Sequence, residues 1–437
     1  METVVQKAEK IGQSTTVKAL IIAVMSLLLL IPESMIENLI RERELRSIET
    51  VEKINEKWSN SQLVNGPYLV IPYQLRKTDA RKTEIIETHK MYLTPEQLSI
   101  KSHLTPEVRH YGIYKSILYK SSIDLKGKFK NPIAFFPSNA EIKWSEAHVR
   151  IGISDLRGIA NNIDFKLNGI QGKANAGGIN DVVGEGMQIA IDNAASLVSA
   201  STSAFSCAIR LNGSGALSFI PVGRNTNVMM SGNWNSPGFI GSFTPEYNLD
   251  KDGFAAKWNV IHFNRNIPEY WTDNEMKTVS ESSFGVSLVD TVDHYQQNMR
   301  SAKYALMFIG LTFIVFFFVE IFTRKRIHPI QYLLVGFALV LFYSLLLSLS
   351  EQIGFGYAYL ISTLSIIGLI LVYAYSVFRN ITQTAFLGLV LSGLYIFMFV
   401  VLQLEDIALL IGSIGLFFIL AIIMYISGKI KWYKQDN

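Results

Sequence analysis

The chain has 437 residues, of which 49% are hydrophobic and 17% are charged, and its net charge is +4. Soluble domains usually carry about 25% charged residues, so this composition excludes an ordinary soluble protein. The small net charge also excludes the concentrated basic face of a nucleic-acid-binding domain, and we expect no nucleic-acid partner.

The first predicted element is an apolar run over residues 17–31, which is followed by "PESMIENLI" without the small-residue cleavage site of a signal peptide. We therefore predict a cytoplasmic tail over residues 1–16 and an uncleaved transmembrane signal anchor over residues 17–40. A juxtamembrane helix is expected over residues 33–58, because apolar residues recur there at helical spacing without glycine. This helix packs either on the domain that follows or on a second copy of the chain.

Residues 41–303 have the composition of a soluble domain. Segments such as "GPYLVIPYQL", "EIKWSEAHVRIGISDL" and "FAAKWNVIHF" alternate apolar and polar residues, and turn residues separate them. This pattern predicts a large all-β domain, either a sandwich or a barrel. Residues 184–200 are expected to interrupt the strands as a helical or irregular segment.

The glycine-rich stretch of residues 211–234, "LNGSGALSFIPVGRNTNVMMSGNW", suggests either a phosphate-binding loop or a β-hairpin. A phosphate loop needs a helix start, usually with a lysine, whereas this stretch lies between two strand-like segments. We therefore predict a hairpin at Asn212-Gly213 and Gly215, where glycine supplies the positive φ of the turn. The second half of the stretch forms either a polar cleft or, more commonly for such residues, the polar edge of a sheet.

The rest of the chain is almost continuously apolar. It contains five runs that are each long enough to cross a lipid bilayer, near residues 304–323, 330–350, 355–378, 384–404 and 406–427. Together with the signal anchor they predict a membrane α-helical bundle of six spans. Its five-span part covers residues 304–427, and the β domain is inserted between spans one and two.

Basic residues are distributed unevenly between the short loops of this bundle. Lys and Arg occur in both tails and in alternate loops, whereas the intervening loops "SEQIGFG" and "QLED" have none. Because basic loops remain in the cytoplasm, we expect both termini to be cytoplasmic, including the tail of residues 428–437. Residues 41–303 are then extracytoplasmic.

The sequence contains no strong catalytic or metal-binding motif. None of the seven histidines forms a His-Glu-x-x-His pair, and Ser214 lacks the Gly-x-Ser-x-Gly spacing of a nucleophile elbow. The single cysteine, Cys207, excludes an internal disulfide and fits a buried strand position. We therefore expect no cofactor, no metal and no enzymatic activity.

A few polar residues remain as candidates for function. Asp155 and Arg157 share one face of a strand and are expected to form an ion pair. Glu320 is the one acidic residue partly inside the predicted bundle and is expected to pair with Arg324 at i,i+4. His328-Pro329 is expected to start a helix, and Glu351 ends span three. The full candidate set is Arg224, Asn225, Trp234, Asp155, Arg157, Glu320, Arg326, His328 and Glu351.

Several strings match a known family. They are "DHYQQNMRSAKYALMFIGLTFIVFFFVE", "FTRKRIHPIQYLLVGFALVLFYSLLLSLSEQIGF", "GPYLVIPY", "ISDLRGI", "LNGSGALSFIPVGRNT" and "NWNSPGFIGSFTP". Over nearly its whole length the chain resembles the CreD family of bacterial inner-membrane proteins. The resemblance implies an inner-membrane protein linked to cell-envelope integrity, to envelope stress and to colicin tolerance. It supplies no catalytic or ligand-binding residue.

Three functions remain open at the level of sequence. The first is a non-enzymatic envelope protein whose β domain contacts an envelope component or another membrane protein. The second is a transporter or exporter component whose β domain captures a ligand, and the third is an enzyme that modifies the envelope. The lipid bilayer is the expected surrounding in each case, and the oligomeric state stays open.

Overall fold

The structure is a computed structural model that describes residues 15–78, 84–177, 183–192, 194–273, 280–288, 294–323, 327–404 and 407–428. The chain divides into two compact units. One is Ile48–Thr291, which is built mainly of strands, and the other combines Met1–Ser47 with Val292–Asn437 and is helical. The division falls after Ser47 and Thr291 rather than at residues 40 and 303, because helix α4 (His294–Lys303) belongs to the helical unit.

The helical unit begins with α2 (Thr15–Leu28) and α3 (Leu30–Trp58). The interruption at Leu29 follows from Pro32, which has no N–H to donate to the carbonyl of residue 28. The backbone N–H of Leu29 still donates to the Met25 carbonyl over 3.1 Å, so the two helices continue each other. The segment predicted as a juxtamembrane helix is covered by α3, whose last residues belong to the β unit.

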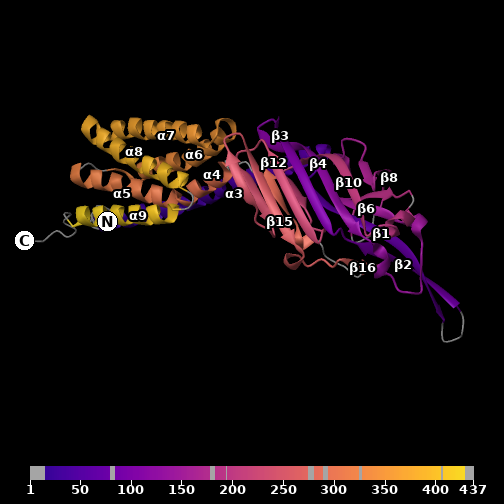
Figure 1. Ribbon diagram of the computed structural model, residues 1–437. Coiled ribbons are helices and arrows are strands. Elements are labelled where there is room, and N and C mark those ends of the chain that lie inside the picture. The colour runs from indigo at the N-terminus through magenta and orange to yellow at the C-terminus, as the bar shows by residue number, and fades with distance from the viewer. Residues whose placement is uncertain are drawn as a thin grey trace, which may run out of the picture. The chain divides into compact units, whose positions relative to one another are not determined.

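Helix α4 is polar, whereas the helices that follow it are apolar and lie beside one another in Figure 1. They are α5 (Ala305–Thr323), α6 (Pro329–Ile353), α7 (Phe355–Phe378), α8 (Ile381–Gln403) and α9 (Ala408–Ser427). In the part of the chain that the structure describes, four helices are long and apolar enough to cross a membrane, or five if α4 and α5, bent by 46°, form one span. The segment Leu410–Ile426 is a shorter apolar helix.

Small residues permit close packing in the helical unit. A Cβ atom on Gly336 of α6 would lie 2.1 Å from a Leu29 side-chain carbon, and one on Gly388 of α8 would lie 3.0 Å from Leu371 of α7. At Gly310 of α5 a Cβ atom would meet nothing within 4 Å. Gly336 therefore sets how closely the first helix approaches α6, as small residues commonly do between helices in lipid.

The β unit contains seventeen strands within the described residues. The first nine are β1 (Gln62–Thr78), β2 (Glu84–Leu93), β3 (Gln97–Tyr111), β4 (Tyr114–Lys130), β5 (Ala140–Ile142), β6 (His148–Ile153), β7 (Asp164–Leu167), β8 (Ile170–Ala176) and β9 (Gly186–Ala190). The others are β10 (Thr202–Ser214), β11 (Ala216–Phe219), β12 (Asn225–Gly232), β13 (Pro237–Gly241), β14 (Glu246–Asp250), β15 (Gly253–Ile261), β16 (Tyr270–Thr272) and β17 (Phe284–Leu288).

These strands form two layers that β8 joins. One layer has the order β14–β15–β12–β3–β4–β10–β7, and its central strands lie side by side in Figure 1. From β7 the chain of pairings passes through β8 to β9, β6 and β1. Strand β1 then pairs with β2, β5 and β11, and β17, β13 and β16 complete the second layer. Most pairs are antiparallel, but β12 runs parallel to β3, and β11 to β1.

One hydrophobic core lies between the layers. Alternate residues of the strands point inward, as the period-two pattern predicts, and the ring of Trp258 from β15 lies 5.3 Å from Phe284 of β17 in the other layer. The core also holds Cys207, which is 3% exposed, so the prediction of a buried strand position is confirmed. The β domain therefore has the two-layer arrangement of a sandwich, with polar residues on its outer faces.

The predicted hairpin at residues 212–215 is wrong. Strand β10 pairs with β4 and β7, whereas β11 pairs with β1 and β17, so the chain crosses at Gly215 from one layer to the other. Gly215 does have a positive φ of 67°, but Gly213 lies inside β10, where a Cβ atom would be 2.3 Å from the Tyr119 hydroxyl. The glycines thus serve a crossover and a close side-chain contact.

The expectation of a helical or irregular segment over residues 184–200 is only partly right. Residues Gly186–Ala190 form β9, which pairs with β6 and β8, and a short 3₁₀ helix, η4 (Ala194–Val198), follows. The alternation in β9 covers only five residues, so it is too short to stand out without its partner strands.

Candidate functional site

Arg224 lies in a network of charges beside the start of β12. Its Nη1 atom is 2.9 Å from Oε1 of Glu269 and its Nε atom is 4.0 Å from Oε1 of Glu96. Lys130 of β4 joins both acids, at 2.8 Å from Glu96 and 3.7 Å from Glu269. The positive and negative groups neutralise one another, so this network holds strand ends together and leaves little charge for a ligand.

The predicted polar cleft between Arg224, Asn225 and Trp234 does not form. Asn225 is the first residue of β12 and Trp234 follows its last, so the strand separates them. The Trp234 indole N–H donates to the carbonyl of Ser236 over 3.2 Å, and its ring packs against the core. The alternative, a polar sheet edge, is also wrong, because β12 is paired on both sides, with β3 and β15.

The predicted ion pair of Asp155 and Arg157 forms, but in a 3₁₀ turn, η3 (Leu156–Gly158), rather than in a strand. Arg157 donates from Nε and Nη2 to the two carboxylate oxygens over 2.9 and 2.8 Å. The Arg157 guanidinium, together with backbone N–H groups of Arg157 and Asn60, lowers the pKa of Asp155 to about 2. Because Arg157 Nη1 also donates to the Glu56 carbonyl in the last turn of α3, the pair anchors the end of that helix.

Glu320 is a buried carboxylate of α5, 6% exposed, and it joins several elements of the helical unit. Its Oε2 accepts a hydrogen bond of 2.9 Å from the Tyr332 hydroxyl of α6, and its Oε1 accepts one of 3.1 Å from the Ile327 backbone. Lys18 of α2 forms a salt bridge with Oε1. The expected partner, Arg324, and the candidate Arg326 lie outside the described residues.

His328 and Glu351 mark the two ends of α6. His328 is the N-cap: its Nδ1 accepts from the Ile330 backbone over 3.4 Å, and Gln331 completes a capping box, so the predicted helix start is confirmed. Glu351 accepts a hydrogen bond of 3.1 Å from the Tyr295 hydroxyl of α4 and lies 3.8 Å from Arg43 of α3. Both residues thus position helices of the helical unit.

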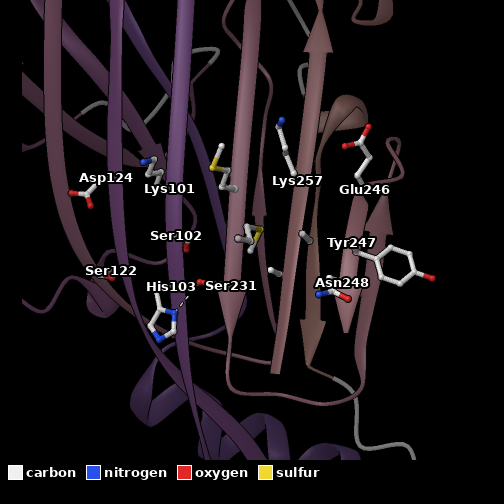
Figure 2. A pocket seen from close by; sticks show the side chains of 14 residues that line it. Lys101, Ser102, His103, Ser122, Asp124, Ser231, Glu246, Tyr247, Asn248 and Lys257 are labelled. Atoms are coloured by element: carbon white, nitrogen blue, oxygen red, sulfur yellow. Dashed lines mark hydrogen bonds between the residues drawn. The ribbon is translucent and has the colours of Figure 1, made fainter. Parts of the chain in front are cut away.

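A different set of side chains surrounds a groove of about 570 Å³ on the outer face of the β unit. The groove lies over β14, β15, β12, β3 and β4, and Figure 2 shows its labelled side chains along these adjacent strands. They are Lys101, Ser102, His103, Ser122, Asp124, Ser231, Glu246, Tyr247, Asn248 and Lys257, and Met229, Met230, Ala255 and Ala256 complete the lining.

Strand register arranges these side chains in two rows. One row runs Glu246–Lys257–Met229–Lys101–Asp124 across five strands, because each residue is paired with the next. The second row, two residues along each strand, runs Asn248–Ala255–Ser231–His103–Ser122. Alanine and serine in the second row leave the backbone uncovered, so small side chains form the floor and the charged row forms one wall.

His103 and Ser231 form the closest polar contact on the floor. His103 Nδ1 and Ser231 Oγ share a hydrogen bond of 2.9 Å, drawn as a dashed line in Figure 2. Both residues sit within strands that are paired on both sides, so the surrounding backbone N–H groups belong to the sheet ladder. Among the described residues no group of three or more His, Cys, Asp or Glu side chains is placed to hold a metal ion.

The family model described as "Inner membrane protein CreD" matches residues 14–433 of the chain. The chain belongs to the CreD family. It is 32% identical over 414 residues to the protein named "Inner membrane protein CreD" of Escherichia coli strain K12, an alignment that covers 93% of this chain and 91% of that relative. The CreD match includes the groove strands and the apolar helices alike, and it makes this chain an inner-membrane protein with a large β domain.

Sequence reasoning for this CreD-family chain missed the groove residues. Lys101, His103 and Lys257 each stand alone among ordinary strand residues, and only the order of the strands brings them together. The alternation of apolar and polar residues indicates which side chains of each strand face outward, but it does not indicate which strands are neighbours. Glu33 of α3 was also missed, although it is buried and its Oε1 atom has no hydrogen-bond partner among the described residues.

Proposed function

We propose that this CreD-family protein spans the inner membrane six times and that its β domain faces the extracytoplasmic side. There it contributes to envelope integrity without catalysis, by holding an envelope component in the groove over β14, β15, β12, β3 and β4. The observation that carries this proposal is the groove, whose polar side chains lie on an outer sheet face and do not belong to the hydrophobic core. A stable fold does not need a groove on an outer sheet face, whereas a site that binds a ligand does.

The orientation rests on the distribution of basic residues. The two tails and the loop with Arg324, Lys325 and Arg326 are basic, whereas the loop after Glu351 and the loop around Glu405 contain no Lys or Arg. Such asymmetry commits the basic side to the cytoplasm, which leaves the β domain on the opposite side. The sixth span in this proposal is α9, whose apolar segment of 17 residues reaches a bilayer's thickness when flanking residues extend it.

The absence of catalysis is supported by the geometry around Ser231. A serine nucleophile needs backbone or side-chain donors for an oxyanion, usually at a turn or a helix start. Ser231 instead lies inside β12, between two paired strands, and its neighbour His103 lies in β3, which is likewise paired on both sides. The His103–Ser231 contact therefore fits ligand hydrogen bonding better than acyl transfer.

The proposal is tested by deletion and by labelling. Replacing residues 60–291 with a short flexible linker keeps α3 and α4, and it is expected to abolish protection of cells against bile-salt detergents. The control is an immunoblot showing that the shortened chain reaches the membrane. Full protection by the helical unit alone would show that the β domain is not needed.

Labelling needs an introduced cysteine, because Cys207 is buried and burial raises the pKa of its thiol to about 12. A Cys207→Ala, Lys173→Cys chain places a thiol on the exposed strand β8. We expect a membrane-impermeant maleimide to label it in intact spheroplasts. Labelling only after permeabilisation would place the β domain in the cytoplasm and overturn the proposed orientation.

A second candidate function, a transporter component, is favoured by buried polar atoms in the helical unit. Glu33 of α3, Asn298 and Ser301 of α4, and Thr312 of α5 each have a buried oxygen without a hydrogen-bond partner among the described residues. Such residues inside a membrane bundle commonly line a path for ions or protons. The test is the flux of ions or protons in proteoliposomes that contain the full chain. Flux that is present with the unchanged protein and is lost with Glu33→Gln, at an unchanged protein yield, would support this candidate over the first.

A further inference from the structure

The groove presents two lysines that the fold does not use. Lys257 of β15 and Lys101 of β3 flank Met229 of β12, so two strand spacings, about 10 Å, separate their positions in the row. Glu246 is the cross-strand partner of Lys257, and Asp124 is that of Lys101. Among the described residues, however, none of these four charged groups forms an ion pair within 4.0 Å.

Basic charge continues from the groove along the same outer face. Lys120, Lys126 and Lys128 of β4 point outward with Asp124, and Arg210 of β10 lies opposite Ser122. Within the described part of the chain these four basic residues also lack an ion pair. Together with Lys101 and Lys257 they outnumber Asp124 and Glu246, the two acids of the groove lining, so the face attracts an anionic ligand from solution.

The neutral groups of the groove indicate how such a ligand is recognised. Asn248, Ser231 and His103 offer hydrogen-bond donors and acceptors across the floor (Figure 2). Tyr247 lies between Glu246 and Asn248 on β14, so its side chain leaves the strand on the opposite face, where its ring lies 4.7 Å from that of Phe239. The floor groups match the hydroxyl groups of a sugar, so the groove suits a polyhydroxylated ligand with negative groups.

Two other polyanions fit this face less well. An extended peptide usually binds by adding a strand to a free sheet edge. Strands β15, β12, β3 and β4 are paired on both sides, so a peptide would have to add to the outer edge of β14, at the rim of the groove and away from its floor. Single-stranded nucleic acid binds on several aromatic platforms, whereas the ring that faces the groove is the imidazole of His103 and the Tyr247 ring packs against Phe239 instead. Both ligands become outcomes of the test below.

We propose that the groove binds an anionic polysaccharide, with carboxylate groups paired to Lys101 and Lys257 and sugar hydroxyl groups hydrogen-bonded to Asn248, Ser231 and His103. The inference deepens the proposed function, on which it rests for the side of the membrane where the polymer is met. Strands β4 and β10 extend the binding face, so several repeating units contact the protein at once.

The test uses the full chain in nanodiscs of uncharged-headgroup lipid. The probe is an oligogalacturonate of defined length, and its fully methyl-esterified form is the neutral counterpart. We expect the carboxylated oligomer to bind and the esterified one to bind at least about tenfold more weakly, since charge-assisted contacts are lost. Raising the salt concentration is expected to weaken binding of the carboxylated oligomer alone.

Variants locate the binding in the groove. The double change Lys101→Gln, Lys257→Gln is expected to raise Kd about tenfold or more, and Asn248→Ala, which removes a hydrogen-bonding group of the floor, is expected to raise it for both oligomers. The matched control, Lys115→Gln with Lys173→Gln, removes the same charge at exposed strand positions outside the groove and is expected to change Kd less than about twofold.

Several results would overturn the groove ligand. They are equal binding of the two oligomers, an unchanged Kd in the groove double variant, or tighter binding of poly-glutamate or of an oligonucleotide with the same number of charges. If the protein fails to bind the carboxylated oligomer while the Lys173→Cys thiol is labelled from outside and the β domain is needed for detergent resistance, the ligand is wrong and the proposed function stands. Labelling from the cytoplasm alone would overturn the proposed function itself.

Discussion

The Tyr332 hydroxyl of α6 donates a 2.9 Å hydrogen bond to Oε2 of Glu320 on α5, and Lys18 of α2 forms a salt bridge with the other carboxylate oxygen. Three helices of the helical unit therefore meet at one buried carboxylate. A carboxylate in such a place is stable only while its charge is balanced, so removing either charge leaves the other without compensation.

The first prediction concerns this carboxylate. Glu320→Gln retains a group that accepts from Tyr332 but leaves Lys18 unpaired, and we expect a loss of about 1–3 kcal/mol in the free energy of unfolding. The double change Lys18→Met, Glu320→Met removes both charges and is expected to destabilise less than Glu320→Gln. Thermal unfolding in lipid nanodiscs measures both. A double variant that is less stable than the single one would contradict the balance of charges as the cause.

The second prediction uses the anchor at the end of α3. Asp155→Asn weakens the contacts to Arg157 and Asn60, and we expect the free energy of local opening near residues 148–160 to fall by about 1–3 kcal/mol at pH 7. The ordinary pKa of the Asp155 carboxyl, 3.8, is lowered to about 2 in the fold. Its stabilising contribution is therefore present above about pH 4 and is lost as the pH falls through about 2.

Hydrogen exchange of the full chain, corrected for intrinsic rates, checks this prediction at pH 7 and at pH 2.5. The difference between Asp155→Asn and the unchanged protein is expected to shrink at the lower pH. Asp164→Asn is the matched control, because Asp164 is an exposed acid whose 3.5 Å pair with Lys166 is also exposed. An equal effect of the two changes would mean that the anchor does not depend on the Asp155 charge.

The third prediction is a pH dependence of opposite sign. His89 of β2 lies 2.6 Å from Asp273 and 3.3 Å from Glu87, and the Asp273 hydrogen bond raises the pKa of the imidazole above its ordinary 6.5. A raised pKa stabilises the fold below about pH 6.5, and this contribution is lost as the pH rises through the folded-state value. His89→Asn is therefore expected to lower the melting temperature more at pH 6 than at pH 8.5.

His110→Asn on the β3–β4 hairpin is the control for this experiment. His110 is exposed near the hairpin tip, opposite Lys115, so its replacement is expected to leave the melting temperature unchanged at both pH values. A His89→Asn effect that is the same at pH 6 and pH 8.5 would exclude the charge of His89 as the source of stability.

The fourth prediction concerns the close approach of the first helix to α6. Gly336→Ala places a methyl group 2.1 Å from the Leu29 side chain, and the crowding is expected to cost about 1–3 kcal/mol. Gly310→Ala, in the open part of α5, is the matched control and is expected to be neutral or slightly stabilising. Melting temperatures in the same detergent compare the two changes, and equal values would contradict the packing at Gly336.

Several parts of this molecule follow from local chemistry alone. The Pro329 position and the His328 cap predict the start of α6, because a cap needs only residues that adjoin it. The alternation around Cys207 predicts a buried strand for the same local reason. Apolar runs of about 20 residues and the basic loops between them are likewise properties of contiguous segments.

The candidate site is different, because it depends on which strands become neighbours. Gly215 reads as a hairpin turn by its own chemistry, but the layers on either side of it decide that it is a crossover. Lys101 and Lys257 are more than 150 positions apart in the chain and come within two strand spacings only through β12. Hydrophobic periodicity determines which face of each strand is outward, whereas the pairing between distant strands, set by packing of the whole core, decides what lies beside it.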